Sequence, residues 1–339
     1  MSKLNVSLLE GRPILDLRSY ARRGPGHRDR LSPAEIAQIS RTVHCAPEVV
    51  VKALSKGSNN LTSVGKHFGY IGRYGDLAVE TDEGQLRQGR DVGATLLEDW
   101  DLDLDEHRYT SDLTPGQGRV APKLVHKLML SMPAGTSPDA VFAAARSFLR
   151  EQFAFKHRYA FVLHTDEPHP HVHAVIKAVS EQGERLHIKK ATLREWRQEF
   201  ARHLRVFGVE ANATERAVRG QSRCALKDGI YRAGERGDSA FLREQAVSVA
   251  SDVLKERRLT EPGKGTLVET RAKVVLGWTS LAHRVASEGY GLLLATDILR
   301  FVDQMPPVRT TLECVAHSVS HRLFHSPVQD RTLNRTLNR

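Results

Sequence analysis

The fold is decided by one stretch of the chain, which runs Leu163-His164-Thr165-Asp166-Glu167-Pro168-His169-Pro170-His171-Val172-His173-Ala174-Val175. It holds four of the sixteen histidines of the protein. Apolar residues precede it from position 160 and continue through its end to position 176, and two prolines stiffen its middle. This pattern predicts two β-strands joined by a turn.

The spacing of the histidines predicts a metal site. In a strand, side chains two residues apart share a face and lie about 6.5 to 7 Å apart, so His171 and His173 project together while Val172 and Ala174 face the other side. If the turn reverses the chain, His164 lies beside this pair on the neighbouring antiparallel strand. Three imidazoles with an open coordination position suit a divalent ion that binds and polarises a phosphate.

Two other interpretations of the histidines stay open, a His-rich turn without a metal and a structural zinc site. Cys45, Cys224 and Cys314 are far apart in the sequence and distant from the histidines, so a closed, sulphur-rich shell is not expected. Cysteines without a C-x-x-C pair also favour a reducing compartment. We therefore expect a catalytic metal and a cytoplasmic protein.

Composition points to a folded, soluble protein with a nucleic-acid partner. The chain has 339 residues, of which 40% are hydrophobic, and a formal net charge of +10. That is enough for one large or two modest domains. Basic residues are in excess around the histidine strands, and a positive surface beside a phosphate-binding metal predicts nucleic acid as substrate; a solvated basic face without a partner is the alternative. We expect no leader and no membrane segment, since the apolar runs are short.

The rest of the pattern predicts an α+β fold with a mainly antiparallel sheet, followed by a small helical region. A helix is expected over Leu61–Tyr74 with Thr62 or Ser63 as N-cap, and it would place Tyr70 and Tyr74 on one face. The other expected elements are a strand over Lys123–Met132, a helix from Ser137 to about Gln152, a short strand over Leu186–Ile188, a helix opening at Thr192 and closed by Gly208, and helices over about 239–257, 266–288 and 291–303.

A metal-activated phosphate still requires a nucleophile, either water or a side chain. A tyrosine hydroxyl suits an enzyme that later reseals the strand, because a phosphotyrosyl ester conserves the energy of the broken phosphodiester. Tyr70 is the natural candidate. Tyr74 is the second, and the remaining interpretation is that both side chains only pack against the helix.

Three motifs together resemble the relaxases of conjugative and mobilisable plasmids. They are His164-x-Asp166-x-x-His169-Pro170-His171-Val172-His173, the preceding Ser131-Met132-Pro133-Ala134-Gly135-Thr136, and His67-x-x-Tyr70-Ile71-x-Arg73. The resemblance covers approximately Thr62–Arg219 and is closest to the branch that contains the T-DNA border endonuclease. It implies a five-stranded antiparallel sheet with flanking helices.

The composition and the apolar pattern divide the chain into three parts. These are a basic N-terminal arm over 1–57, with one or two short helices within Pro33–Leu54, a relaxase nuclease domain over 58–222, and a helical C-terminal region over 223–339. The nuclease domain contains an acidic insertion at about 76–112. This insertion could be a loop that mimics DNA charge or a docking segment, but a solvated insertion is the expectation we favour, because runs of like charge are usually exposed.

Roles for the site residues follow from the same resemblance. Tyr70 would attack one strand at a nic site and become linked to the 5′-phosphate, leaving a free 3′-hydroxyl. His164, His171 and His173 would hold Mg²⁺ or Mn²⁺, with His169 as a reserve. Asp166 would orient a ligand imidazole or assist proton transfer. Weaker candidates for contacts with DNA phosphates are Arg73, Lys177, Lys189, Lys190 and Arg194.

The function expected from these roles is a site- and strand-specific nick at a transfer origin, with later rejoining of the strand, in conjugative transfer or mobilisation. The expected partners are single-stranded DNA at that origin, accessory proteins of the relaxosome and the coupling protein of a type IV secretion system. A rolling-circle replication initiator or a single-strand transposase would use the same chemistry. A non-catalytic DNA-binding relative is the remaining alternative.

Overall fold

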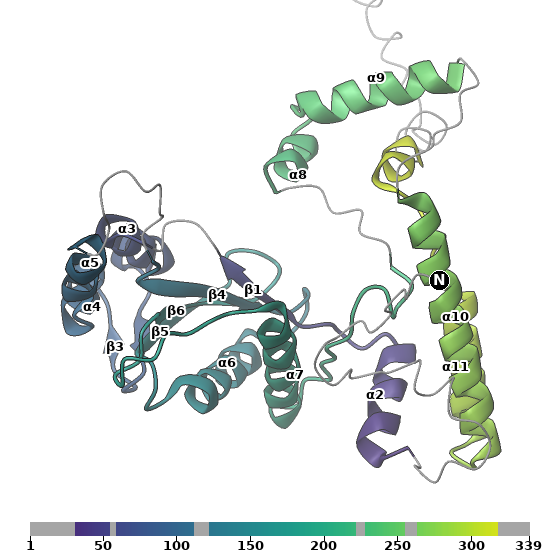
Figure 1. Ribbon diagram of the computed structural model, residues 1–339, viewed down its shortest axis with the longest axis horizontal. Helices are drawn as coiled ribbons and strands as arrows, with labels where there is room; N and C mark the ends of the chain where they lie inside the picture. The colour runs from purple at the N-terminus through teal and green to yellow at the C-terminus, as the bar shows by residue number, and fades with distance from the viewer. Residues whose placement is uncertain (1–30, 55–58, 112–121, 222–227, 255–262, 318–339) are drawn as a thin grey trace, which may run out of the picture. The chain divides into compact units, whose positions relative to one another are not determined.

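The computed structural model describes residues 31–54, 59–111, 122–221, 228–254 and 263–317 (Figure 1). Contacts within the chain divide these residues into two compact units. We call them the sheet unit, residues 31–214, and the helical unit, residues 215–317. The N-terminal 30 residues and the last 22, which include the basic tail, lie outside the described residues.

The sheet unit is built on six antiparallel strands in the order β1-β4-β6-β5-β2-β3 (Figure 1). The strands are β1 Val50–Leu54, β2 Val79–Thr81, β3 Leu86–Arg87, β4 Val125–Ser131, β5 Tyr159–His164 and β6 His171–Lys177. The expected α+β class and antiparallel sheet are confirmed. The sheet has six strands rather than five, and three of them, β1 and the short hairpin β2–β3 of the acidic segment, lie where no strand was expected.

β5 and β6 form the predicted histidine hairpin. Their register pairs His164 with His171 and Val162 with His173. β6 is also paired with β4 on its other side, so it lies inside the sheet and all seven of its residues are buried. Because both faces of β6 are buried, the residues at 172 and 174–176 are apolar whichever face they point to.

One face of the sheet is covered by α6, Pro138–Phe153, and α7, Lys190–Val206. As predicted, the Ser137 hydroxyl caps α6 by accepting a hydrogen bond from the amide of Ala140. α7 begins two residues before the expected Thr192 and is followed by Gly208 at φ 78°. Its buried stripe against the sheet includes Trp196 and Phe200. The predicted strand over Leu186–Ile188 is wrong, since the chain there forms only an isolated bridge at Arg185.

The opposite face is covered by α3, Leu61–Ile71, with α4, Val92–Asp99, and α5, Leu102–Ser111. The Trp100 ring packs edge-on against Phe68, with ring centroids 5.5 Å apart, and both side chains are fully buried. α3 and α4 approach so closely that a Cβ on Gly93 would lie 3.1 Å from the carbonyl oxygen of Gly65. The acidic segment is therefore an integral part of this core and not a solvated insertion, because its apolar positions recur at helical spacing between the charges.

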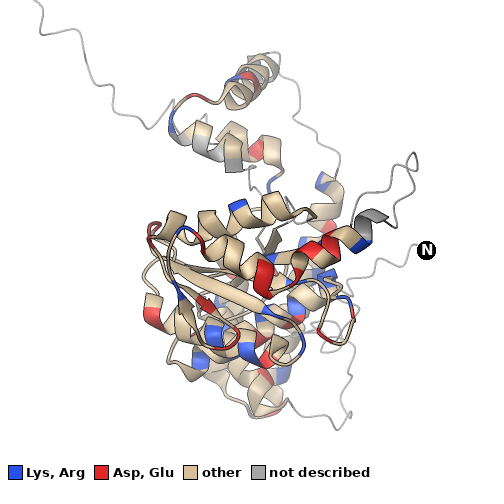
Figure 2. Ribbon diagram, turned by 90° about the vertical axis from the view of Figure 1, so that its left-hand side faces the viewer, with Lys and Arg blue, Asp and Glu red and all other residues tan. Residues whose placement is uncertain are grey.

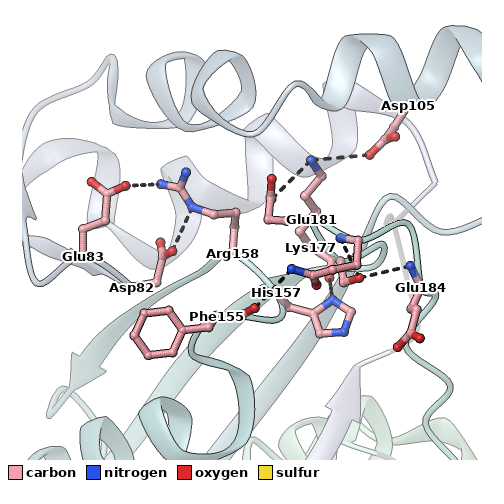
Figure 3. Close-up of polar contacts among 11 residues, drawn as sticks. Asp82, Glu83, Asp105, Phe155, His157, Arg158, Lys177, Glu181 and Glu184 are labelled. Carbon is pink, nitrogen blue, oxygen red and sulfur yellow. Dashed lines mark hydrogen bonds and ion pairs between the residues drawn. The ribbon is translucent and has the colours of Figure 1, made fainter.

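The carboxylates of the acidic segment find basic partners at the end of the hairpin far from the histidines (Figure 3). There Arg158 contacts Asp82 at 2.8 Å and Glu83 at 3.1 Å. Lys177 lies 4.0 Å from Asp105 and 3.9 Å from Glu181. Over the ribbon as a whole, acidic and basic positions are interspersed (Figure 2). Lys177 is buried in this cluster, which leaves it unsuited to the DNA contact that we expected of it.

The chain before the tyrosine helix also belongs to the sheet unit. α2, Pro33–Val43, begins with a capping box in which the Ser32 hydroxyl accepts from the amide of Glu35. β1 then forms the edge of the sheet and pairs with β4. We expected only helix over Pro33–Leu54; the three consecutive valines at 49–51 favour a strand instead, because β-branched side chains suit a pleated surface.

The helical unit consists of α8, Asp228–Glu235, α9, Ala240–Leu254, α10, Lys264–Ser287, and α11, Leu292–Asp303. The predicted helices at 239–257, 266–288 and 291–303 are confirmed. α10 and α11 pack through Trp278 and Phe301, whose ring centroids lie 5.3 Å apart. Among the helices in the described ranges, none combines the length and the apolar character needed to cross a membrane. Cys45 is a free thiol, whereas Cys314 is disulfide-bonded, which differs from the expectation of unpaired cysteines.

Candidate metal centre and nucleophile

Three histidines meet at one end of the β5–β6 hairpin, on the face of the sheet that carries α3. We call His164, His171 and His173 the triad. Their ring centroids lie 4.8 to 5.2 Å apart, and one ligand nitrogen from each lies within 4.8 Å of the others. All three residues are buried. The structure brings the predicted metal ligands together because His164 and His171 are register partners and His173 is two residues further along β6.

Hydrogen bonds to backbone carbonyls orient two of the triad rings. The Nε2 atom of His164 lies 2.7 Å from the carbonyl oxygen of Ile71, and Nδ1 of His171 lies 3.0 Å from that of His169. Each of these nitrogens must carry the proton and donate it, which leaves a lone pair on the other nitrogen of each ring. The lone pair on Nδ1 of His164 faces the guanidinium of Arg73 at 3.3 Å. A carbonyl partner for the second nitrogen is the usual way in which a metal-binding histidine is oriented.

The third ring lacks such a partner. Nδ1 of His173 is buried and makes no hydrogen bond with any described residue. A buried polar atom is normally satisfied, so an unpaired nitrogen beside two oriented imidazoles indicates a site that takes a ligand. This observation supports the fit of the triad to a divalent cation.

Burial favours the neutral form of His164 and His173, which is the form that a metal requires. Desolvation, followed by the nearby His164 and His171, lowers the pKa of His173 to about 3. Burial is also the main cause that lowers the pKa of His164. Because only the neutral imidazole has a lone pair to donate, these shifts favour metal binding at neutral pH.

Tyr70 lies in the last turn of α3, beside the triad. Its ring centroid is 6.4 Å from that of His164 and 6.2 Å from that of His173. His67, one turn earlier on the helix, stacks on the tyrosine ring at 6.1 Å with the planes 19° apart. Tyr70 remains 47% exposed, so the phenol is positioned by packing and still open to a substrate. The N-cap of this helix is Asn60 and not one of the two residues that we expected.

Tyr74 does not share the helix face of Tyr70. α3 ends at Ile71, and Arg73 and Tyr74 have φ values of 49° and 55°, in the left-handed region. The Tyr74 ring folds back over Gly69, where a Cβ would meet it at 3.7 Å, and the residue is 70% exposed. The expected face shared by both tyrosines is therefore wrong, because the chain leaves the helix at Gly72.

Arg73 links the tyrosine helix to the histidine turn. Its Nη2 atom lies 2.5 Å from Oδ2 of Asp166 and 3.3 Å from Nδ1 of His164, and its guanidinium carbon lies 5.1 Å from the centre of the Tyr70 ring. Burial alone would raise the pKa of Asp166, but backbone hydrogen bonding and then Arg73 outweigh it and lower that pKa. Asp166 thus orients Arg73, and no hydrogen bond from it to a triad imidazole is found among the described residues.

The remaining predicted residues lie outside this cluster. His169 is exposed and contributes its backbone carbonyl, while its ring stands outside the triad. Lys189, Lys190 and Arg194 lie at the start of α7, whose helix packs on the opposite face of the sheet. His67 was part of the tyrosine motif but was given no role, although residues three apart on a helix are neighbours and His67 therefore lies beside Tyr70.

Residues 82–209 match the family model for the MobA/VirD2-like relaxase nuclease domain. This part of the chain is similar to a relaxase nuclease domain. The matched range includes the triad and Asp166 and begins after Tyr70. The family resemblance carried by the histidine motif is thereby confirmed.

The chain is also similar to the T-DNA border endonuclease VirD2 of Agrobacterium fabrum, with 26% identity over 209 residues. The similarity covers 55% of this chain and 44% of VirD2. The chain thus spans less than half of the length of the curated relative that it matches. The site combines three buried imidazoles with an exposed phenol and a guanidinium beside it, and these groups are chemically suited to act on a phosphodiester.

Proposed function

We propose that this protein is a metal-dependent relaxase that nicks one strand of DNA at a transfer origin, becomes linked to the 5′ end through Tyr70 and later rejoins the strand. The observation that carries this proposal is the position of the Tyr70 ring within 6.4 Å of the rings of His164 and His173, between centroids. A phosphate bound at the triad would lie within reach of the phenol.

The triad would hold the cofactor, which we propose to be Mg²⁺ or Mn²⁺. When bound, the ion supplies a Lewis acid that polarises the scissile phosphate. The fit rests on the unpaired Nδ1 of His173, on the two rings oriented by carbonyls and on the burial that lowers the pKa of His164 and of His173.

The protein's own side chains then perform the transfer. The Tyr70 oxygen attacks phosphorus, the bond from phosphorus to the 3′-oxygen breaks, and the 5′-phosphate becomes an ester of tyrosine. The 3′-oxygen takes up a proton, and the phenol loses its proton to solvent, to which Tyr70 is open. The cation of Arg73, held by Asp166, lies over the Tyr70 ring and favours the charge that develops on the phenol and phosphate oxygens. Rejoining reverses these steps, with the 3′-hydroxyl as the attacking group.

The setting of the reaction is part of the same proposal. Single-stranded DNA at a transfer origin would be the substrate, and relaxosome accessory proteins and a type IV coupling protein would be partners in conjugative transfer or mobilisation. The resemblance to the relaxase branch and the net charge of +10 support this assignment. We also propose a cytoplasmic location, a nuclease domain that ends near residue 222 and a separate role for the helical region beyond it.

Formation of a covalent adduct tests the proposed function. End-labelled single-stranded oligonucleotides that carry candidate origins from the same replicon are incubated with the full chain and Mg²⁺ or Mn²⁺. We expect a protease-sensitive, slowly migrating band that disappears with EDTA and in Tyr70→Phe, and that persists in the matched variant Tyr74→Phe. Retention of the band in Tyr70→Phe, or cleavage without any adduct, would overturn the assignment.

A further inference from the structure

A second polar site lies on the face of the sheet opposite the triad. A cavity of about 210 Å³, open to solvent on one side, is lined by α2, α7 and the segment that follows α7. Its lining residues are Gln38, Arg41, Gln198, Glu199, Ala201, Arg202, Arg205, Asn212 and Ala213. Three of the nine are arginines and one is acidic. Ala201 and Ala213 belong to the core packed against this face, so the cavity is built into the sheet unit.

The acidic lining residue is already paired with one of the arginines. Nε of Arg202 donates to Glu199 at 2.7 Å, and Nη2 of Arg202 donates to Glu151 at 2.6 Å. These two carboxylates lower the net charge of Arg202 and its surroundings. They leave the other two guanidinium groups of the cavity without a counterion from this pair.

Arg41 is the least satisfied of the lining residues. Its Nε atom is buried and has no hydrogen-bond partner among the described residues. A nearby carboxylate, Glu48, is engaged by the amide of Thr214 at 2.7 Å and by the side chain of Asn212 at 3.2 Å. A buried guanidinium nitrogen normally has an acceptor, so this one indicates an absent anion.

Arg205 faces the same cavity and forms no ion pair with a carboxylate of the described residues, although Glu210 and Glu199 act on it at longer range. Its Nη1 atom donates to the carbonyl oxygen of Ala211 at 2.8 Å, which positions the group without neutralising it. Burial, followed by the positive charge of Arg41, lowers the pKa of Arg205. Two cations that repel each other in a partly buried cavity are stabilised by an anion placed between them.

We propose that this cavity binds a phosphate group through Arg41 and Arg205. The planar fork of a guanidinium matches two phosphate oxygens, and a pair of guanidiniums can neutralise a dianion. The side chains of Gln38 and Gln198 add polar groups to the same wall. The phosphate belongs either to the backbone of a bound DNA strand or to a small phosphorylated molecule. This site is separate from the triad and does not depend on the proposed nicking reaction.

Thermal unfolding with inorganic phosphate tests the proposal on the full chain. The melting temperature is measured in EDTA at constant ionic strength, with chloride replaced by phosphate in steps. We expect a saturable rise for the wild type, a rise at most half as large for Arg41→Gln and Arg205→Gln, and an unchanged rise for Arg150→Gln. Arg150 is an exposed arginine on the neighbouring helix α6 and lies outside the cavity.

Each variant is compared with its own phosphate-free melting temperature, so a change in basal stability does not imitate loss of binding. Arg41→Lys keeps the charge and should keep part of the phosphate effect. An equal rise in wild type and both cavity variants, or no rise in the wild type, would overturn the proposal. Because the measurement is made without a divalent metal and without DNA cleavage, its failure is distinct from failure of the proposed function.

A second arm identifies the source of the phosphate. Binding of a fluorescein-labelled single-stranded oligonucleotide without an origin is measured in EDTA at several salt concentrations. If the phosphate is that of DNA, Arg41→Gln should weaken binding, and the slope of log affinity against log salt should be less steep by roughly 0.7. If the two proteins bind the oligonucleotide equally while their phosphate responses differ, the ligand is a small phosphorylated molecule.

Discussion

Arg73 and Asp166 form an ion pair with 2.5 Å between Nη2 and Oδ2, and it joins the turn after the tyrosine helix to the turn of the histidine hairpin. The two residues lie 93 positions apart in the sequence. The same arginine nitrogen lies 3.3 Å from Nδ1 of His164, and the guanidinium stacks over Tyr70. One cation thus contacts a proposed ligand, the proposed nucleophile and a carboxylate that keeps it in place.

Loss of the Asp166 carboxylate should slow adduct formation, because Arg73 is then no longer held in place. In Asp166→Asn we expect the rate of adduct formation under single-turnover conditions to fall about 10- to 100-fold, the range typical of groups that orient a metal site. Mn²⁺ affinity, measured on the same protein, should fall much less, because Asp166 does not touch the triad imidazoles directly. The matched change Glu167→Gln alters the next carboxylate of the turn. An equal loss in both variants would show that the turn, and not the ion pair, matters.

The three imidazoles of the triad should be the protein's ligands to a divalent ion, without the imidazole of His169. His171→Ala should weaken Mn²⁺ binding at least about 100-fold by titration calorimetry or electron paramagnetic resonance, because one of three nitrogen ligands is lost. His169→Ala should bind Mn²⁺ like the wild type, since this residue serves the site through its backbone carbonyl. Comparable weakening in His169→Ala would place that imidazole in the coordination shell.

His126, a buried histidine at the start of β4, should make the free energy of unfolding depend on pH. Burial lowers the pKa of His126 to about 4, while its Nε2 lies 2.9 Å from the carbonyl oxygen of Leu186. The unfolded chain takes up this proton near pH 6.5 and the folded chain does not, so stability falls as the pH drops from about 6.5 towards 4. The loss at pH 5 should be on the order of 1 kcal/mol after allowance for solvent screening.

Urea unfolding at pH 7, 6 and 5 in EDTA measures this dependence. His126→Gln should unfold with a shallower fall in stability over that range than the wild type, whatever its stability at pH 7. Parallel curves for the two proteins would exclude His126 as a source of the dependence.

The acidic segment should prove essential to the core. Trp100→Ala removes a fully buried indole that packs on Phe68, and we expect it to lower the free energy of unfolding by about 3 to 5 kcal/mol. Leu104→Ala, four residues later and 59% exposed, should change it by less than about 0.5 kcal/mol. Denaturant unfolding compares the two. A small effect at Trp100 would restore the interpretation of a loosely attached insertion.

The histidine hairpin could be predicted from sequence because its information is local. Alternation along a strand places His171 and His173 on one face, and the prolines of the turn bring His164 beside them. The helices α6, α10 and α11 could also be predicted from sequence, since caps and apolar spacing mark them. These features depend on residues close together in the chain.

The features that sequence reasoning missed depend on distant partners or on single backbone angles. The charges of the acidic segment concealed the apolar positions of α4 and α5, whose burial depends on the sheet. Left-handed conformations at Arg73 and Tyr74, which separate the two tyrosines, have no marker in the residue types. Lys177 looked like a surface cation until Asp105 and Glu181 were found around it.

Identifying the residue that becomes linked to DNA is the most direct test of Tyr70 as the nucleophile. Trypsin cuts after Lys66 and after Arg73, so Tyr70 and Tyr74 fall into different peptides. Adduct formed by the wild-type chain is digested with nuclease and trypsin and examined by mass spectrometry. We predict a nucleotide remnant on the peptide from His67 to Arg73, at Tyr70. A remnant on the peptide that begins with Tyr74, or on no tyrosine at all, would contradict this account of the site.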